Sequence, residues 1–432
     1  MFQPELESMP REDLQQLQLS RLQNTVERCY ATVDHYREAM DELGVKPHHI
    51  QTLADIRHLP FTKKEHLRQN YPFGMFSVPK EQVVRVHASS GTTGKPTVVG
   101  YTRRDVKTWA SLMARSLGAG GLKAGDRVQN AYGYGLFTGG LGFHYGAEEL
   151  GCMVIPISGG QTQKQLMLLK DFLPDAICCT PSYALNLAEA AEEMGLDMRK
   201  LPVKVGFFGA EPWTEAMRYE IESRLHIDAV DIYGLSELIG PGVAQECVHA
   251  KKGLHVWEDH FMVEVVDPDS GEPLPVGEKG ELVITSLSKE AFPIIRYATR
   301  DISFLDPSPC KCGRTHVRMA RPMGRTDDML IIRGVNVFPS QVEAVLLKTE
   351  TLSPFWQIEV FRDGNMDSLL VNVEASVPLA EQGQEAMDRV ASKTLKDIKD
   401  FIGISCRVAV KMPGEVPRSQ GKAVRVVDHR KG

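Results

Sequence analysis

The residues best suited to chemistry form a run of small hydroxylated residues and glycines that ends in a lysine and a proline. The run is Ser89-Ser90-Gly91-Thr92-Thr93-Gly94-Lys95-Pro96. Glycines let backbone N–H groups wrap an anion closely, and the hydroxyl groups and Lys95 add donors and positive charge. A Walker A loop instead has four residues between its glycines and Ser or Thr after the lysine. The run alone predicts an anion-binding loop or a plain polar turn, and it excludes a P-loop NTPase.

A second candidate group consists of cysteine and histidine residues in two separate segments. Cys247, His249 and His255 lie in the first segment, and Cys310 and Cys312 lie in the second. Three thiolates and one imidazole suit a tetrahedral structural zinc site, and intracellular thiols are more often metal ligands than disulfides. Free thiols or a redox pair are the alternatives, and His249 competes with His255 for the fourth position.

Five segments, in order, resemble the signature motifs of the adenylate-forming superfamily, which includes acyl-CoA synthetases. The first is the run at 89–96. The others are residues 231–237 (Asp-Ile-Tyr-Gly-Leu-Ser-Glu), 297–301 (Tyr-Ala-Thr-Arg-Asp), 324–328 (Gly-Arg-Thr-Asp-Asp) and 417–422 (Pro-Arg-Ser-Gln-Gly-Lys). Residues 133–140 and 331–340 and the short chain resemble more closely the phenylacetate–CoA ligase family.

The resemblance implies a two-step reaction. A carboxylate, with phenylacetate or a related arylacetate as the first candidate, attacks the α-phosphorus of ATP and pyrophosphate leaves. Coenzyme A then attacks the acyl-adenylate and AMP is released. Because negative charge gathers on phosphate oxygens in the first step, the site needs preorganised donors and a divalent cation, here Mg²⁺.

The resemblance also implies roles for the residues of an ATP site. The loop holds the β- and γ-phosphates, and Thr92 is among the catalytic residues. Tyr233 stacks on adenine and Glu237 ligates Mg²⁺. Asp301 accepts hydrogen bonds from the ribose hydroxyls, and Arg325 steadies the ribose or the phosphates. The residues expected to bind ATP or coenzyme A are Ser89, Ser90, Gly91, Thr92, Thr93, Gly94, Lys95, Ala210, Glu211, Pro212, Asp231, Tyr233, Gly234, Ser236, Asp301, Arg325 and Gly334.

Lys422 is the expected catalytic lysine because of its place in the 417–422 motif. An ammonium group on a long stem can neutralise charge at the carboxylate and the α-phosphate. Asp327 is the expected hinge of a small rotating domain, with Asp328 as the alternative. Gly334 would then face the site and help to receive coenzyme A, since glycine suits close backbone approach.

The resemblance also implies a pocket for the acyl group and a zinc site. Aromatic walls suit an aryl group, and small residues leave room for a flat ring. The expected pocket lining is Tyr134, Phe137, Ala210, Gly240 and Pro241. The expected zinc ligands are Cys247, His255, Cys310 and Cys312, because Gly-Leu-His recurs in the resembling family. This zinc would be structural and would hold a loop near the substrate pocket.

The elements that must position these residues follow from the spacing of apolar residues. Residues 1–80 have helical spacing, and from 83 to about 322 short apolar runs alternate with amphipathic segments, which predicts parallel sheets with crossover helices. Residues 260–305 change to a strand–turn–strand pattern, which predicts a barrel-like appendage. The expected strands of the first part are 127–128, 152–157, 176–179, 204–208 and 229–233.

The polar segment 324–328 divides the chain. We expect a large α/β domain at 1–323, a hinge at 324–328, and a small mobile α+β domain at 329–432, since about 105 residues suffice for a domain. Within the small domain the pattern predicts a strand at 329–332, a helix at 340–348, and then strand, helix and strand.

Charge and composition exclude several partners. Lys plus Arg number 50 and Asp plus Glu number 56, a net charge of −6, which gives no reason to expect nucleic acid or an anionic membrane. No apolar run approaches the roughly 20 residues of a membrane span, and the acidic N-terminus has no leader pattern. We expect a cytoplasmic protein, and a homodimer is compatible with the sequence.

Three other functions fit parts of the pattern. They are an adenylating ligase for another aryl acid, a ligase that loads a carrier protein, and a catalytically silent nucleotide-binding protein on the same scaffold. The joint presence of Glu237, Asp301 and Lys422 disfavours the silent scaffold.

Overall fold

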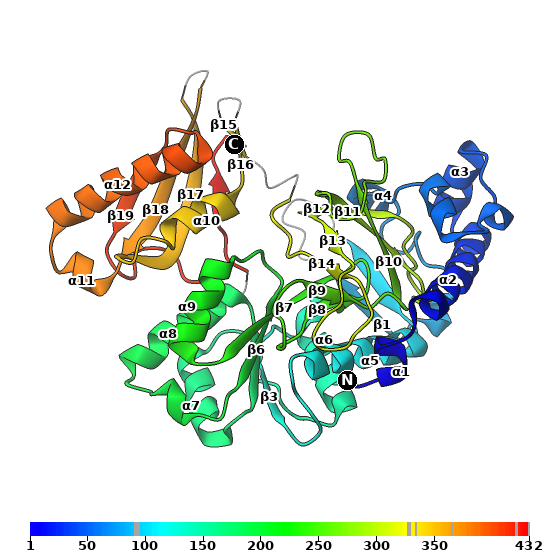
Figure 1. Cartoon of the computed structure of the whole chain (residues 1–432), viewed down its shortest axis with the longest axis horizontal. Helices are drawn as coiled ribbons and strands as arrows, with labels where there is room; N and C mark the ends of the chain where they lie inside the picture. The colour runs from blue at the N-terminus through cyan, green and yellow to red at the C-terminus, as the bar shows by residue number, and fades with distance from the viewer. Residues whose placement is uncertain (90–95, 326–329, 333–334, 364–365, 420–421, 431–432) are drawn as a thin grey trace.

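Mixed sheets and helices make up both domains of the computed structural model (Figure 1). The structure describes the chain except for residues 90–95, 326–329, 333–334, 364–365, 420–421 and 431–432. The predicted α/β fold class is confirmed, with a large N-terminal domain and a smaller C-terminal domain.

Helices at the beginning of the chain cover one side of the large domain, as the helical spacing predicted (Figure 1). They bury apolar residues such as Leu22, Val26 and Tyr36 in the main core. The helices are α1 (Pro4–Glu7), α2 (Arg11–Thr32), α3 (Asp34–Glu42) and α4 (Lys64–Gln69).

A nine-stranded mixed sheet forms the centre of the large domain. Its order is β13-β14-β9-β8-β7-β6-β5-β3-β4, and β4, β3, β5, β6 and β7 are parallel. All residues of β5 and β6 are buried, as expected for a parallel sheet covered on both faces. The strands are β3 (Arg127–Asn130), β4 (Met153–Ile155), β5 (Ala176–Cys179), β6 (Val205–Gly209), β7 (Asp228–Leu235), β8 (Gly240–Glu246), β9 (Leu254–Val256), β13 (Leu305–Asp306) and β14 (Arg318–Met319).

Crossover helices connect the parallel strands, as the alternating pattern predicted. A parallel connection needs such a crossover because the chain must return to the same edge of the sheet. The helices of this domain are α5 (Arg103–Ala119), α6 (Thr138–Leu150), α7 (Thr162–Phe172), α8 (Pro181–Glu193) and α9 (Glu215–Leu225).

Two small antiparallel sheets flank the central sheet. β1 (Arg85–Ala88) pairs with β2 (Val98–Tyr101) on either side of the expected phosphate loop. β10 (Phe261–Val266), β11 (Gly280–Ser286) and β12 (Tyr297–Ser303) form a three-stranded sheet in that order. The strand–turn–strand prediction is thus right for 261–286, but the barrel-like appendage is not confirmed, since the described strands form an open sheet.

The C-terminal domain has a core of its own. Its four-stranded sheet has the order β19-β18-β17-β20, and β15 pairs separately with β16. Ile358, Val371 and Ile398 are fully buried in this core. The elements are β15 (Leu330–Ile332), β16 (Val335–Val337), α10 (Pro339–Leu346), β17 (Leu352–Asp363), β18 (Met366–Ala375), α11 (Val377–Ala380), α12 (Gln384–Ile402), β19 (Arg407–Lys411) and β20 (Val426–Asp428).

The predicted order of the small domain is wrong after α10. One strand, one helix and one strand were expected, whereas β17 and β18 form a long antiparallel pair before the helices. The sequence Asp-Gly-Asn at 363–365 is typical of a hairpin turn. The prediction missed this signal and treated the apolar residues on its two sides as one strand.

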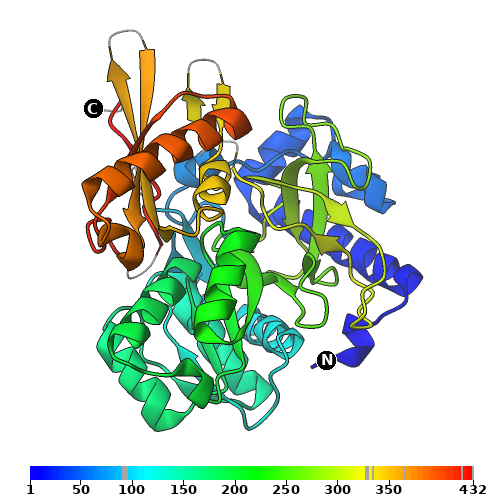
Figure 2. The ribbon, with the colours of Figure 1, turned by 60° about the vertical axis from the view of Figure 1, so that its left-hand side comes forward.

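The two domains lie side by side (Figure 2) and touch through polar and apolar contacts. Arg418 pairs with Glu189 of α8 at 2.8 Å, and Thr214 donates a hydrogen bond of 2.7 Å to Glu343. Phe355 and Val416 of the small domain pack into the cluster formed by α8 and α9. These contacts hold the small domain over the carboxyl ends of β6 and β7.

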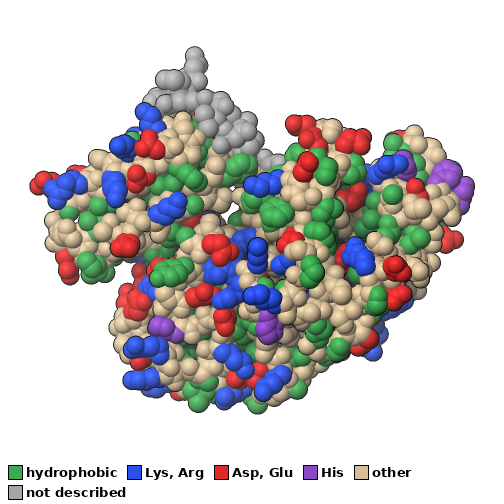
Figure 3. All heavy atoms as spheres, viewed as in Figure 1, with side chains coloured by type: hydrophobic (Ala, Val, Ile, Leu, Met, Phe, Trp, Pro, Cys, Tyr) green, Lys and Arg blue, Asp and Glu red, His purple; other side chains and the backbone are tan. Residues whose placement is uncertain are grey.

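The surface carries mixed charge. On the face drawn in Figure 3, acidic and basic side chains are interspersed over both domains. None of the helices that the structure describes is both long enough and apolar enough to cross a membrane.

Candidate active site

The floor of the candidate site is the carboxyl edge of the parallel strands, where ligands bind in open α/β sheets. β6 ends at Gly209, and Ala210 follows with a φ of +71°, a left-handed conformation that is uncommon for alanine. β7 ends beside β8, where a Cβ on Gly234 would lie 2.0 Å from the carbonyl oxygen of Gly240. Only glycine permits this close approach.

Asp301 is held between Tyr233 and Arg325 at one side of this floor. The Tyr233 hydroxyl donates a hydrogen bond of 2.6 Å to one carboxylate oxygen, and the Arg325 Nε lies 3.5 Å from the other. Burial raises the pKa of Tyr233, and the Asp301 charge raises it further. The structure therefore brings together three residues expected to bind the nucleotide.

Glu237 lies just beyond β7, and its side chain is almost fully buried at 6% exposure. Ser236 next to it forms a hydroxyl contact of 3.2 Å with Thr138 at the start of α6. Burial raises the pKa of nearby Tyr297, and the Glu237 carboxylate adds to this rise. A carboxylate is a hard oxygen donor and is therefore a suitable ligand for a hard cation.

Lys422 comes from the small domain and reaches the large one. Its Nζ lies 5.7 Å from the centre of the Phe137 ring. Desolvation by the surrounding protein lowers the pKa of Lys422, whereas the carboxylates of Glu237 and Glu211 raise it. The ammonium group thus lies near the Phe137 ring, within the influence of the Glu237 and Glu211 charges.

Glu211 links the two domains beside Lys422, a role that the sequence did not predict. Its carboxylate accepts one hydrogen bond of 2.7 Å from the backbone of Ser182 in the large domain. It accepts another of 2.7 Å from the backbone of Ala423, the residue after Lys422. Only the folded chain brings these backbone donors together, so residue types alone gave no signal.

Three of the expected acyl-pocket residues, Tyr134, Gly240 and Pro241, contact other side chains of the large domain. Tyr134 accepts a hydrogen bond of 2.8 Å from Asn130, and burial raises the pKa of Tyr134 to about 12. A Cβ on Gly240 would lie 2.5 Å from the Trp109 ring, and the Pro241 carbonyl accepts the Trp109 indole N–H at 2.9 Å. The space beside Gly240, which was expected to leave room for a flat ring, is therefore filled by the buried Trp109 side chain.

Asp231 is engaged in a buried ion network under the site. Its carboxylate pairs with Arg321 at 2.9 Å, and Arg321 also approaches Glu246 and Glu215. Glu246 in turn pairs with Arg218 at 2.8 Å. The nucleotide role expected for Asp231 stays a prediction, as does that of the exposed Pro212.

Several expected site residues lie outside the part of the chain that the structure describes. Ser89 is described, and it closes the base of the phosphate loop through a backbone hydrogen bond of 3.0 Å to Thr97. The residues outside the described ranges are Ser90, Gly91, Thr92, Thr93, Gly94, Lys95, Asp327, Asp328 and Gly334.

The cysteine and histidine residues converge on one cluster behind the site. The ligand atoms of Cys247, His255, Cys310 and Cys312 lie within 4.8 Å of one another. The Cys247 and Cys310 sulfurs are 3.7 Å apart, close to the roughly 3.8 Å that tetrahedral zinc–sulfur bonds of about 2.3 Å require. His255, and not His249, belongs to this cluster, and its second ring nitrogen lies 3.4 Å from the carbonyl of His316.

Family comparisons match this architecture. Residues 16–288 match the family described as AMP-binding enzyme, and residues 334–430 match the AMP-binding enzyme C-terminal domain. The fold is that of 2-hydroxyisobutyryl-CoA ligase in its postadenylation state with 2-HIB-AMP, with a TM-score of 0.94 and 30% identity over 99% of this chain and 92% of that one. With the same ligase in its thioesterification state the TM-score is 0.74, over 98% and 91% of the chains. The class of protein is therefore an adenylate-forming ligase.

Curated relatives narrow this class. The phenylacetate-coenzyme A ligase of Aromatoleum evansii is 56% identical over 428 residues, 98% of this chain and 96% of that protein. The phenylacetate-coenzyme A ligase of Thermus thermophilus is 53% identical over 444 residues and 100% of both chains. The chain belongs to the phenylacetate–coenzyme A ligase family, which consists of AMP-forming acid–thiol ligases.

Proposed function

We propose that this protein activates phenylacetate, or a closely related arylacetate, with ATP and transfers the acyl group to coenzyme A. The observation that carries the proposal is the position of Lys422, which reaches from the small domain to Phe137 and to the carboxylates of Glu237 and Glu211. The names of the relatives supply the substrate class.

In the first step, Lys422 orients the substrate carboxylate and neutralises charge as it attacks the α-phosphorus. Asp301 accepts hydrogen bonds from the ribose hydroxyls, beside Arg325, and Tyr233 borders the adenine. The loop at 89–95, with Thr92, holds the leaving phosphates. Pyrophosphate departs with the electron pair of the broken P–O bond.

Glu237 is the residue proposed to hold Mg²⁺. Its carboxylate is a hard oxygen donor, and the residue is almost fully buried just beyond β7. When bound, the cation would supply charge neutralisation at the phosphate oxygens.

In the second step the small domain rotates about the segment 324–328, with Asp327 or Asp328 as the pivot. Domains at 1–323 and 329–432 fit the two separate cores. The higher similarity to the postadenylation state than to the thioesterification state supports a structure closed for the first step. Rotation would withdraw Lys422 and bring Gly334 toward the thiol of coenzyme A.

The acid-binding pocket is proposed between Tyr134 and Phe137, with Ala210, Gly240 and Pro241 at its edges. Aromatic walls favour an aryl acid over a short aliphatic one. Structural zinc is proposed on Cys247, His255, Cys310 and Cys312, since their separations fit a tetrahedral ion.

A cytoplasmic location is proposed, since none of the eight cysteines, all of which the structure describes, forms a disulfide and reduced cysteines persist in reducing compartments. A homodimer is also proposed, and light scattering would find a mass about twice the 48.0 kDa of the chain.

The deciding experiment is acid-dependent exchange of pyrophosphate into ATP across a panel of aryl and short aliphatic acids. Phenylacetate should support the fastest exchange, and added coenzyme A should give the thioester. If another aryl acid gives the fastest exchange, that acid is the substrate. If only a carrier protein is acylated, the carrier protein and not coenzyme A is the acceptor. An absence of exchange with every acid would exclude a ligase.

Lys422→Ala tests the assigned chemistry. Exchange should fall at least about 100-fold, because a charge-stabilising donor is lost, while thioester formation from supplied acyl-adenylate should persist. Lys393→Ala, at an exposed position of α12, is the matched control. An equal loss of both half-reactions in Lys422→Ala would contradict the role.

A further inference from the structure

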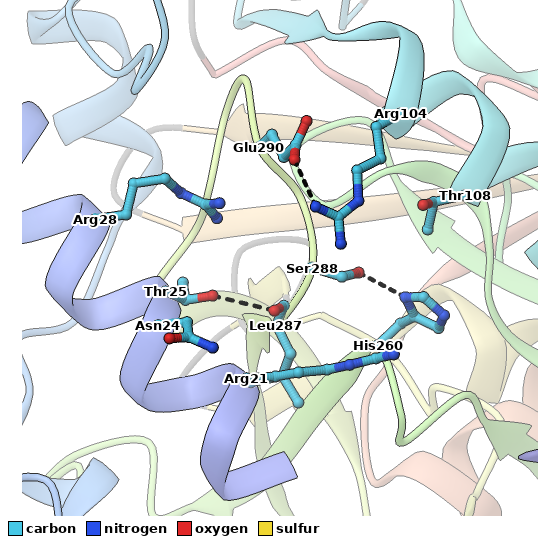
Figure 4. Close-up of a pocket in the computed structure, with 10 residues that line it drawn as sticks. All are labelled: Arg21, Asn24, Thr25, Arg28, Arg104, Thr108, His260, Leu287, Ser288 and Glu290. Atoms are coloured by element: carbon cyan, nitrogen blue, oxygen red, sulfur yellow. Dashed lines mark hydrogen bonds and ion pairs between the residues drawn. The ribbon is translucent and has the colours of Figure 1, made fainter. Parts of the chain in front are cut away.

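A polar cavity lies away from the expected ATP and acyl sites, between α2, α5 and the segment that joins β11 to β12 (Figure 4). Its volume is about 410 Å³. Arg21 and Arg28 reach it from α2, Arg104 comes from α5, and His260 and Ser288 complete one wall. None of the residues assigned above to ATP, the acid or zinc lines it.

Positive charge exceeds negative charge at this cavity. Of the ten lining residues three are arginines and one, Glu290, is acidic. Both oxygens of Glu290 are already engaged, one with Arg104 at 2.9 Å and one with the Thr102 hydroxyl at 2.8 Å. Glu290 is therefore not available to neutralise the guanidinium groups of Arg21 and Arg28.

The carboxylate nearest to Arg21 is that of Asp259, which forms shorter contacts with another arginine. Asp259 lies 4.0 Å from Arg21, but its two oxygens accept hydrogen bonds of 2.8 and 2.9 Å from Arg115. Burial lowers the pKa of Arg21, and the charges of Arg115 and Arg104 lower it further, whereas Asp259 raises it. An additional anion would relieve this repulsion.

Arg28 has no carboxylate partner among the described residues. One of its terminal nitrogens donates to the carbonyl of Lys289 at 2.6 Å, and its Nε is buried without a hydrogen-bond partner. Figure 4 shows Arg28 and Arg104 directed toward one another across the cavity from opposite helices. Two like charges that converge on one solvent-filled space form a favourable site for an anion.

We propose that this cavity binds a phosphate group, as a phosphomonoester or a diphosphate. Guanidinium groups present forked donors that match phosphate oxygens, and Thr108 and Asn24 offer further polar contacts at the rim. The group can come from the phosphorylated end of coenzyme A, in which case the inference rests on the proposed function, or from a free phosphorylated metabolite.

The wall of the cavity also connects it to the active site. Lys289 lies between Ser288 and Glu290, yet its ammonium group turns to the opposite side and lies 3.7 Å from the centre of the Tyr101 ring. The Glu237 charge acts on Lys289 from that side. An occupant of the cavity would therefore contact the segment that carries Lys289, and the Glu237 carboxylate acts to raise the pKa of Lys289.

The test is charge reversal at the rim with a neighbouring residue as control. Arg104→Glu changes a side chain that is 75% exposed, so the fold should tolerate it. Arg103→Glu makes the same change at the preceding exposed position of α5, outside the cavity. Pyrophosphate exchange with phenylacetate is measured first in the wild type and both variants. Its absence from all three would contradict the proposed function. The effect of inorganic phosphate on Tm, described below, would still test the phosphate site.

Two measurements then identify the source. If coenzyme A occupies the cavity, its KM should be about tenfold lower than that of 3′-dephospho-coenzyme A in the wild type and in Arg103→Glu. Arg104→Glu should abolish that difference. If a free ligand occupies the cavity, inorganic phosphate should raise the Tm of the wild type and of Arg103→Glu but not of Arg104→Glu. Identical behaviour of the two variants in both measurements would overturn the proposal and leave the arginines as structural contacts only.

Discussion

Lys289 shows at the scale of one residue how the fold changes the chemistry of a side chain. Lys289 is 2% exposed, and its ammonium group packs on the Tyr101 ring and has no hydrogen-bond partner in the part of the chain that the structure describes. Burial lowers its pKa to about 7, although Asp105 and Glu237 raise it. The pKa of an unfolded lysine is about 10.4. Between these values the unfolded chain binds a proton that the folded chain lacks, so stability rises with pH.

Lys289→Met should remove this dependence. The variant should be more stable than the wild type at pH 7, and the difference should shrink by up to about 1.4 kcal/mol per pH unit between pH 7 and 9. Denaturant unfolding at three pH values measures it, with Lys107→Met, an exposed lysine on α5, as the control. A difference that stays constant with pH would show that Lys289 remains charged in the fold.

At the scale of elements, the cysteine and histidine cluster ties together two segments that lie far apart in the sequence. β9 carries His255, the residues after β8 carry Cys247, and the turn between β13 and β14 carries the Cys-Lys-Cys sequence. β13 and β14 have only two residues each. Such short strands at a sheet edge have little stability alone, so the metal ligands would fix them.

Cys310→Ser should remove the metal and loosen this edge. The wild type should contain about one zinc per chain, and the variant should lose it, with a fall in Tm of at least about 3 °C. Cys152→Ser, another buried thiol far along the sheet, is the control and should retain the metal. Elemental analysis and calorimetry measure both effects. A wild type free of zinc would refute the site.

At the scale of the whole molecule, contacts between the large and the small domain hold the two domains together, and a domain rotation must break these contacts. Arg418 bridges Glu189 of the large domain and Glu374 of its own domain, at 2.8 and 2.7 Å. Glu211 adds backbone contacts on both sides of the interface. Partly exposed ion pairs contribute little each, about 1 kcal/mol or less, which suits an interface that opens once per turnover.

Glu189→Ala should weaken only the closed state, because Arg418 keeps Glu374. Pyrophosphate exchange should fall about three- to fivefold, whereas thioester formation from supplied acyl-adenylate should be unchanged or faster. Glu192→Ala lies on the same helix but pairs with Arg224 inside the large domain, and it should change neither rate. A similar loss in both half-reactions of Glu189→Ala would contradict a role in closure.

The sequence predicted those features that depend on local order. Alternating apolar runs predicted β3 to β7 and their helices, because parallel strands buried on both faces need such runs. Short motifs predicted Glu237, Asp301 and Lys422, since each motif keeps chemical groups at fixed spacing. The barrel-like appendage and the order after α10 were not predicted correctly, because pairing partners of strands are not encoded in local periodicity.

Only the tertiary structure decided which distant groups meet. It selected His255 over His249 for the cysteine cluster, placed Trp109 against Gly240, and made Glu211 a link to the backbone beside Lys422. It also buried an ordinary lysine at 289 and so lowered its pKa, and it gathered three arginines around one cavity. Burial and the approach of charges far apart along the chain arise only when the chain folds, so residue types and spacing alone do not contain them.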